Sequence, residues 1–435
     1  MSLSAEADST GGFLEVLSST GFRRLLTGQA ASSLGDWVAT LAFIVAADEL
    51  TGGNQTAVAA VLVLRLVPPI FAAPVGGVIA DRLYRRTIMV SCDLTRAALI
   101  ALVPFVNIGL LYAIAFVHEC ISLFFIPARD ASVPSLVPRR SLTEANGLFL
   151  ATSYGSIPIA ALLFSGLAAV ATHIPGWIPF AHLFRDHPTS FAFFFDSATF
   201  VFSATMIAGL QLHRQARRED IELVEGLMEG VRYVLAHPGL RALAYGLIVS
   251  MFGGGVLFAV GIGYIQDTLG GNAVAFGWLA ALWGAGMGIG LAIVRLLIKR
   301  GQALVFVAAV VLCGGVLLVM AFLPVLWLAF VAAVVFGAAF SVAILIALTI
   351  AQETAEDRIR GRIMAGVQML FRIGLGAGAL GVGALAHAVK EVNLLITLDG
   401  NQVGLIAGGV LILLGAVASA GVASPGVWSD RGEPA

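Results

Sequence analysis

The sequence predicts an all-α membrane protein with twelve transmembrane helices in two six-helix bundles. Of its 435 residues, 59% are hydrophobic and only 12% are charged, whereas soluble domains carry about 25% charged residues. This composition excludes an ordinary water-soluble globule. Long stretches without charge recur along the chain, and a helix needs about 20 apolar residues to cross the hydrocarbon core of a bilayer. These stretches therefore predict the spans.

The predicted spans follow one another with short loops between them. Stretches that hold one or two buried charges are counted as spans. The long uncharged stretch after Arg300 is divided by Pro324, because proline breaks a helix ladder. The twelve predicted spans cover residues 27–48, 55–79, 87–107, 109–129, 144–171, 190–211, 241–265, 273–297, 302–322, 325–351, 361–387 and 402–423.

The basic residues predict the orientation in the membrane. Short cytoplasmic loops accumulate Arg and Lys, and the loops after the even-numbered spans hold nearly all the loop cations of this chain. The opposite loops hold only Arg185 and Lys390. We therefore expect a multi-pass protein of the cell membrane with both termini in the cytoplasm. The first 22 residues lack the basic start of a cleavable signal peptide.

One long polar stretch divides the spans six and six. Within it, Ile221, Val224 and Met228 recur at helical spacing, which predicts an amphipathic helix on the cytoplasmic face. The predicted organisation is a cytoplasmic segment (1–26), an N-terminal bundle (27–211), the linker (212–240), a C-terminal bundle (241–423) and a cytoplasmic tail (424–435).

The loop between the second and third spans carries a recognisable pattern. Residues 77–86 read G-x-x-x-D-R-x-x-R-R, which resembles the signature of the major facilitator superfamily of secondary transporters, although Tyr84 stands where that family has glycine. The segments Gly35-Asp36-Trp37 and Pro127-Ala128-Arg129, with Arg360-Gly361-Arg362, resemble its drug-exporter branch, which includes macrolide and siderophore exporters. The resemblance covers all twelve spans and implies the major facilitator fold.

The same loop is predicted to act as a gate latch. Its glycines allow close helix approach, its acid suits the positive N-terminus of a helix, and its arginines can bridge to acids. In the family, the acid that pairs with these arginines lies at the cytoplasmic end of the fourth span, where Asp130 is the candidate. Such contacts would set the balance between inward and outward states. The alternative is that the cations only fix topology. The predicted latch residues are Gly76, Gly77, Asp81, Arg82, Arg85, Arg86 and Asp130.

Ionisable residues at membrane depth are the candidate functional residues, because inserting one costs at least about 2.5 kcal/mol. Asp36 and Glu119 are the candidates for proton coupling, since taking up a proton removes the cost of burying a charge, and Arg65 is the expected counter-charge. The alternative is a purely structural ion-pair network. The predicted coupling and cavity residues are Asp36, Arg65, Asp93, Arg96, Glu119, Asp196 and Arg372.

Four of the intramembrane residues allow more specific interpretations. Asp93 and Arg96 lie three positions apart on one helical face and are predicted to neutralise each other. His118 is interpreted as a packing residue that forms hydrogen bonds, because it and the adjacent Glu119 point to different helix faces. Arg372 either attracts an anionic substrate group or pairs with an acid of the other half.

Several functional classes are excluded or disfavoured. The net charge of −1 gives no basic surface for nucleic acid. The two lysines, Lys299 and Lys390, stand outside any Gly-Lys-Ser/Thr motif, which excludes ATP hydrolysis at a P-loop. We expect no metal site, no cofactor and no enzymatic activity, and we expect a monomer in the lipid bilayer.

The predicted function is secondary active transport. The favoured reading is proton-coupled efflux of a hydrophobic or amphiphilic small molecule by alternating access, with protons or another ion as the coupling species. The alternatives are a lysophospholipid or lipid-precursor translocator, an importer of the same fold, and a membrane scaffold that transports nothing.

Overall fold

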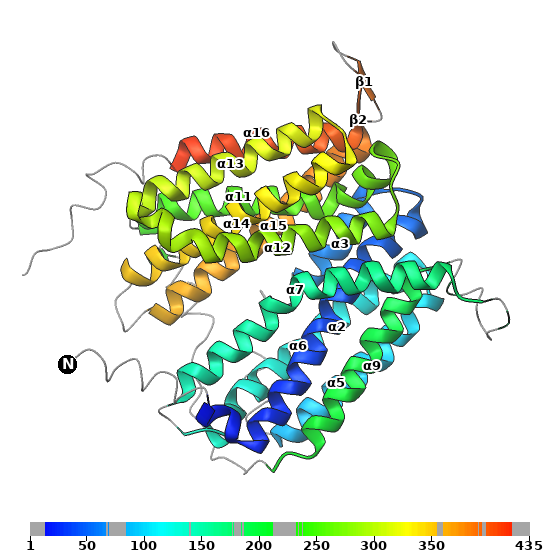
Figure 1. The fold of residues 1–435 in the computed structure, drawn as a ribbon, viewed down its shortest axis with the longest axis vertical. Helices are drawn as coiled ribbons and strands as arrows, with labels where there is room; N and C mark the ends of the chain where they lie inside the picture. Colours follow the sequence, from blue (N-terminus) through cyan, green and yellow to red (C-terminus); the bar gives the residue numbers. More distant parts are fainter. Residues whose placement is uncertain are drawn as a thin grey trace, which may run out of the picture. The chain divides into compact units, whose positions relative to one another are not determined.

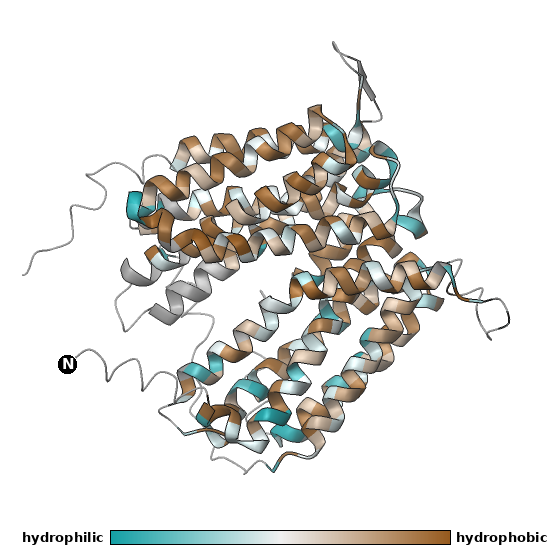
Figure 2. Ribbon diagram, viewed as in Figure 1, coloured by the Kyte–Doolittle hydropathy of each residue, from teal (hydrophilic) through white to brown (hydrophobic). Residues whose placement is uncertain are grey.

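The computed structural model describes residues 14–66, 68, 84–138, 141–175, 177, 184, 187–211, 232–233, 235–236, 238–354, 360–389, 391–393 and 397–419. Within these ranges the chain is mostly helical (Figure 1). Eleven helices of the described chain are long and apolar enough to cross a membrane. Hydrophobic residues predominate along these helices (Figure 2). These observations support the predicted α-helical membrane protein.

The first of two compact units comprises Met1–Ala46 and Pro68–Ile221. Short 3₁₀ turns follow two of its helices, and Asn107 caps the start of another by accepting a hydrogen bond from the Leu110 N–H at 3.0 Å. Its described elements are α2 (Thr20–Thr51, of which the residues from Ala47 belong to the second unit), α5 (Arg85–Leu102), η1 (Val103–Phe105), α6 (Ile108–Ser132), η2 (Val133–Ser135), α7 (Leu142–Thr172) and α9 (Thr189–Ala208).

The second unit comprises Ala47–Val67 and Glu222–Ala435. A two-stranded antiparallel hairpin, with Glu391 opposite Asp399, precedes its last helix. Its described elements are α3 (Gln55–Leu66), α11 (Pro238–Gly263), the π-helical turn η4 (Tyr264–Thr268), α12 (Ala273–Leu297), η5 (Ile298–Arg300), α13 (Gln302–Phe322), α14 (Leu326–Thr354), α15 (Arg360–Ala388), β1 (Glu391–Asn393), β2 (Thr397–Asp399) and α16 (Gly400–Ser419).

Eleven of the predicted spans correspond to long helices of the structure. The second does so only in part: α3 has 12 residues, and most of the rest of 55–79 lies outside the described residues. Most of the predicted linker helix over 212–240 also lies outside them, as do the latch residues Gly76, Gly77, Asp81 and Arg82.

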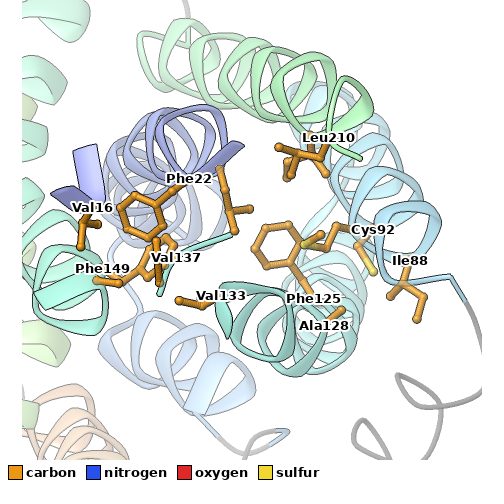
Figure 3. Packing of buried hydrophobic residues seen from close by; sticks show 14 residues of the cluster. Val16, Phe22, Ile88, Cys92, Phe125, Ala128, Val133, Val137, Phe149 and Leu210 are labelled. Atoms are coloured by element: carbon orange, nitrogen blue, oxygen red, sulfur yellow. The ribbon is translucent and has the colours of Figure 1, made fainter. Parts of the chain in front are cut away.

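An aromatic core holds the first unit together near the start of α2. Phe22 of α2 meets Phe149 of α7 edge to face, with 5.4 Å between ring centroids, and Phe125 of α6 lies in the same buried cluster (Figure 3). Edge-to-face packing suits the quadrupoles of aromatic rings. This core ties together α2, α6 and α7.

Glycines allow helices of the second unit to approach backbone to backbone. A Cβ at Gly255 of α11 would overlap the Leu375 carbonyl oxygen and lie 2.7 Å from the Ala379 nitrogen, both in α15. Gly288 of α12, by contrast, has open space around it. Small residues at such positions are typical of membrane helix pairs. The α11–α15 pair therefore depends on Gly255.

We expect Gly255→Leu to destabilise the protein by about 1–3 kcal/mol or more, because the added side chain forces the two backbones apart. Gly288→Leu makes the same change in open space and is expected to leave stability nearly unchanged. Thermal unfolding of both variants in detergent measures the difference. Equal midpoints for the two variants would contradict the packing argument.

Candidate functional site

Ionisable side chains from three helices meet inside the first unit. Asp36 of α2, His118 of α6 and Asp196 of α9 each offer one atom to a group whose atoms all lie within 4.8 Å of one another. His118 Nε2 is 3.6 Å from Asp36 Oδ1, and His118 Nδ1 is 4.0 Å from Glu119 Oε1. We refer to Asp36, His118, Glu119 and Asp196 as the Asp36 cluster. It combines three carboxyl groups with one imidazole.

The Asp36 cluster is buried on one side and accessible on the other. The side chain of His118 is 1% exposed and Asp196 is fully buried, whereas the side chains of Asp36 and Glu119 are 30% and 18% exposed. The two partly exposed carboxyl groups therefore connect the buried imidazole to the surface of the unit. This arrangement suits the exchange of a proton with that surface.

Gly35 lets α2 pack directly against α9 at the cluster. Asp196 Oδ1 accepts a hydrogen bond from Thr199 Oγ1 at 3.2 Å. A Cβ at Gly35 would overlap both of these atoms. The Gly35-Asp36 pair thus has a physical explanation: the glycine brings the helices together, and the next residue places its carboxyl group beside His118.

A second ionic group lies in α5. Arg96 donates a hydrogen bond to Asp93 Oδ1, and its guanidinium lies between two rings, 4.6 Å from the Phe125 centroid and 4.3 Å from that of Phe200. Both charged residues are buried, with Asp93 at 0% and Arg96 at 3% exposure. Contact with aromatic faces stabilises a desolvated guanidinium. The pair is therefore held in one place.

The Asp93–Arg96 pair adjoins the Asp36 cluster through shared neighbours. The His118 ring meets the Phe200 ring edge to face at 5.5 Å. Ser122 Oγ donates to the His118 carbonyl at 3.1 Å and accepts a hydrogen bond from Arg96 at 3.3 Å. A movement of His118 would therefore be transmitted to Arg96 through direct contacts.

The position of His118 departs from the sequence-based interpretation. The sequence suggested a packing residue turned away from Glu119, but the structure places its ring between the carboxyl groups of Asp36 and Glu119. One signal was available: His118, Ser122 and Phe125 recur at the spacing of one helix face, and that face meets the buried charges of α5.

Two predicted residues belong to the other unit. Arg65 lies in α3 and Arg372 in α15, two helices of the second unit that pack against each other. The pairing of Arg65 with Asp36 or Glu119 stays a prediction.

The arginines at the predicted cytoplasmic end bind main-chain carbonyls. Arg85 donates to the Ala131 carbonyl at 2.6 Å and Arg86 to that of Leu210 at 3.3 Å. Cations suit the carbonyl-rich C-terminal ends of helices, here α6 and α9. Asp130, the predicted acid partner of the latch, forms an ion pair with Arg129 at 2.7 Å.

Comparisons with known proteins agree with this architecture. The sequence model of the Major Facilitator Superfamily matches residues 25–379. The Uncharacterized MFS-type transporter YkuC of Bacillus subtilis (strain 168) is 22% identical over 396 residues, 86% of this chain and 86% of that protein. Multidrug efflux pump Tap of Mycobacterium bovis (strain BCG / Pasteur 1173P2) is 26% identical over 389 residues, 82% of this chain and 84% of that protein.

A solved structure shows the same fold. It is a bacterial homolog of the human lysosomal transporter Spinster in its inward-facing and unoccupied conformation. The TM-score is 0.70 at 16% identity, and the match covers 96% of this chain and 99% of that chain.

Proposed function

Because the chain belongs to the major facilitator superfamily, we propose that it is a secondary active transporter that exports hydrophobic or amphiphilic small molecules in exchange for protons. The proposal includes twelve spans in two six-helix bundles that alternate access, with α3 as the first part of the second span. It places the protein in the cell membrane with both termini in the cytoplasm, as the arginine distribution predicts. Similarity to a multidrug efflux pump supports the direction of transport.

The observation that carries the proposal is the Asp36 cluster. Three carboxyl groups around one imidazole, deep in an apolar bundle, are costly to a protein that needs only a stable core. Binding a proton at Asp36 or Glu119 removes one negative charge beside His118. The contacts of α2, α6 and α9 would then differ between the loaded and empty states, which couples helix packing to the proton gradient. In this proposal Arg65 is the counter-charge, and Asp93, Arg96, Asp196 and Arg372 support the site or the cavity.

Uptake into inverted membrane vesicles tests this function. Ethidium, an amphiphilic cation, and a panel of uncharged amphiphiles serve as probes. We expect uptake when the vesicles are energised and its loss when an uncoupler is added. Absence of gradient-driven flux for every probe would favour a scaffold, and accumulation in right-side-out vesicles instead would indicate an importer.

We expect Arg85→Ala to change the resting ratio of inward and outward states. Arg85 links the first turn of α5 to the end of α6, so removal of its guanidinium releases the C-terminal end of α6 from α5. The ratio is measured by accessibility of introduced cysteines after Cys92, Cys120 and Cys313 have been replaced by serine.

Arg23→Ala is the matched control. Within the described part of the chain, the guanidinium of Arg23 forms only a local hydrogen bond, from Nη2 to Thr20 Oγ1 at 3.4 Å. An unchanged ratio in Arg85→Ala would indicate that the arginine only helps to fix the orientation of the protein in the membrane.

A further inference from the structure

Polar side chains gather at one end of the second unit, where several helices begin or finish. Asp48 lies at the end of α2, Gln55 at the start of α3 and Asp267 in η4. Asp399 ends β2, and Asn401 lies in the first turn of α16. We refer to these five residues as the end cluster. It is separate from the Asp36 cluster of the first unit.

Hydrogen bonds connect some members of the end cluster, and its carboxyl groups lie near enough to repel one another. Gln55 Nε2 donates to Asn401 Oδ1 at 3.1 Å, and Asn401 also bonds to Asp267. A Cβ at Gly263 would overlap Gln55 Nε2, so the amide lies directly against the backbone of α11. The carboxyl group of Asp267 interacts unfavourably with those of Asp48 and Asp399.

Two buried acceptors of the cluster lack a partner. Asp48 Oδ1 and Gln55 Oε1 have no hydrogen bond within the described part of the chain, and each residue is only 4% exposed. Buried polar atoms are nearly always satisfied, because leaving one without a partner costs free energy. Both atoms are acceptors, so the partner that would satisfy them is a cation or a donor.

The charge of this end favours a cation. The described stretches that form it, 47–55, 263–272, 391–393 and 397–402, contain no lysine or arginine; Lys390, which precedes β1, lies outside the described residues. The two buried atoms of the cluster that lack a partner are a carboxylate oxygen and an amide oxygen. Hard divalent cations prefer this set, and Ca²⁺ tolerates irregular geometry and carbonyl ligands better than Mg²⁺ does. The π-helical turn that carries Asp267 is a type of distortion that occurs frequently at functional sites.

We propose that the end cluster binds Ca²⁺ through the carboxyl groups of Asp48 and Asp267 and the amide oxygen of Gln55. Asp399 contributes negative charge, while its oxygens accept hydrogen bonds from Thr268 and from the Gln402 N–H. The ion fastens the end of α2 and the start of α3 to η4. By the predicted topology this end faces outward, where affinities of roughly 10⁻⁴–10⁻³ M are typical of calcium modules.

Thermal unfolding of the purified full-length chain in detergent tests the proposal. We expect CaCl₂ to raise the unfolding midpoint in a saturable way, and MgCl₂ or NaCl at equal ionic strength to raise it much less. Binding is measured independently as Tb³⁺ luminescence displaced by Ca²⁺. A wild-type chain that shows neither effect overturns the proposal.

Matched variants locate the site. Asp48→Asn is expected to abolish the Ca²⁺-dependent shift, whereas Glu49→Gln removes the same charge from the adjacent exposed residue and should keep it. Equal loss in both variants would indicate diffuse binding to an acidic surface and overturn the assignment. If Asp48→Asn does not fold, Asp267→Asn takes its place, and the wild-type titration is decisive in either case. Retention of the full shift in Asp48→Asn also contradicts the proposal.

Discussion

The double variant Asp36→Asn with Glu119→Gln is expected to reduce gradient-driven uptake to the level of empty vesicles. Both substitutions keep the size of the side chain and remove its ability to take up a proton. They delete the two partly exposed carboxyl groups beside His118 and so cut the buried imidazole off from its route to the surface of the unit. Initial uptake rates in energised inverted vesicles measure the effect.

A second measurement separates coupling from folding and from substrate binding. Substrate exchange at equal pH on both sides needs no gradient, so we expect the double variant to retain it. Glu49→Gln removes an exposed acid from the same helix, α2, and should leave uptake near the wild-type rate. Gradient-driven uptake that survives in the double variant would remove Asp36 and Glu119 from the coupling mechanism.

Arg96→Met is expected to destabilise the protein by about 3–5 kcal/mol, the cost of leaving one partner of a buried ion pair alone. The variant leaves the carboxyl group of Asp93, which is fully buried, without its guanidinium. It also removes the cation from between the rings of Phe125 and Phe200. Denaturant titration in detergent micelles measures the change in the free energy of unfolding.

Two comparisons distinguish the buried pair from a general effect of losing an arginine. Arg129→Met breaks an ion pair whose acid, Asp130, is 55% exposed. Arg129 itself is 14% exposed and lies 5.1 Å from the Phe149 ring centroid, so the variant also loses a ring contact and should cost about 1–2 kcal/mol, less than Arg96→Met. Asp93→Asn combined with Arg96→Met removes both charges and should recover much of the stability lost in the single variant. A single variant as stable as the Arg129→Met control would contradict this account.

The spans could be predicted from the sequence because lipid imposes one simple requirement on helices. For 273–297 and 302–322 the predicted and observed bounds coincide, since Asn272 caps the first and Gly301, with φ of +101°, separates the two. The helix α2 begins at Thr20, before the predicted residue 27, because a helix continues past the apolar stretch into the polar boundary. The β1–β2 hairpin is too short for alternation to reveal it.

The candidate site could be predicted only in part. Asp36 and the Asp93–Arg96 pair stand out because charges in apolar stretches are conspicuous. The role of His118 depends on how α2, α6 and α9 are rotated about their axes, and the sequence of one helix does not specify its rotation against others. The end cluster does not emerge from the sequence for a related reason: its members come from three stretches far apart in the chain, as with Gln55 and Asn401, and each looks ordinary in isolation.

Arg85 and Arg86 bind peptide carbonyls, so the chemical identity of the residues they touch is of little consequence. Every residue type presents the same oxygen at positions 131 and 210, provided that the helix ends there. The residue types at those two positions could therefore vary while the contacts of the arginines persisted. A search for correlated substitutions would detect no coupling between the arginines and their contacts, even though the contacts are real.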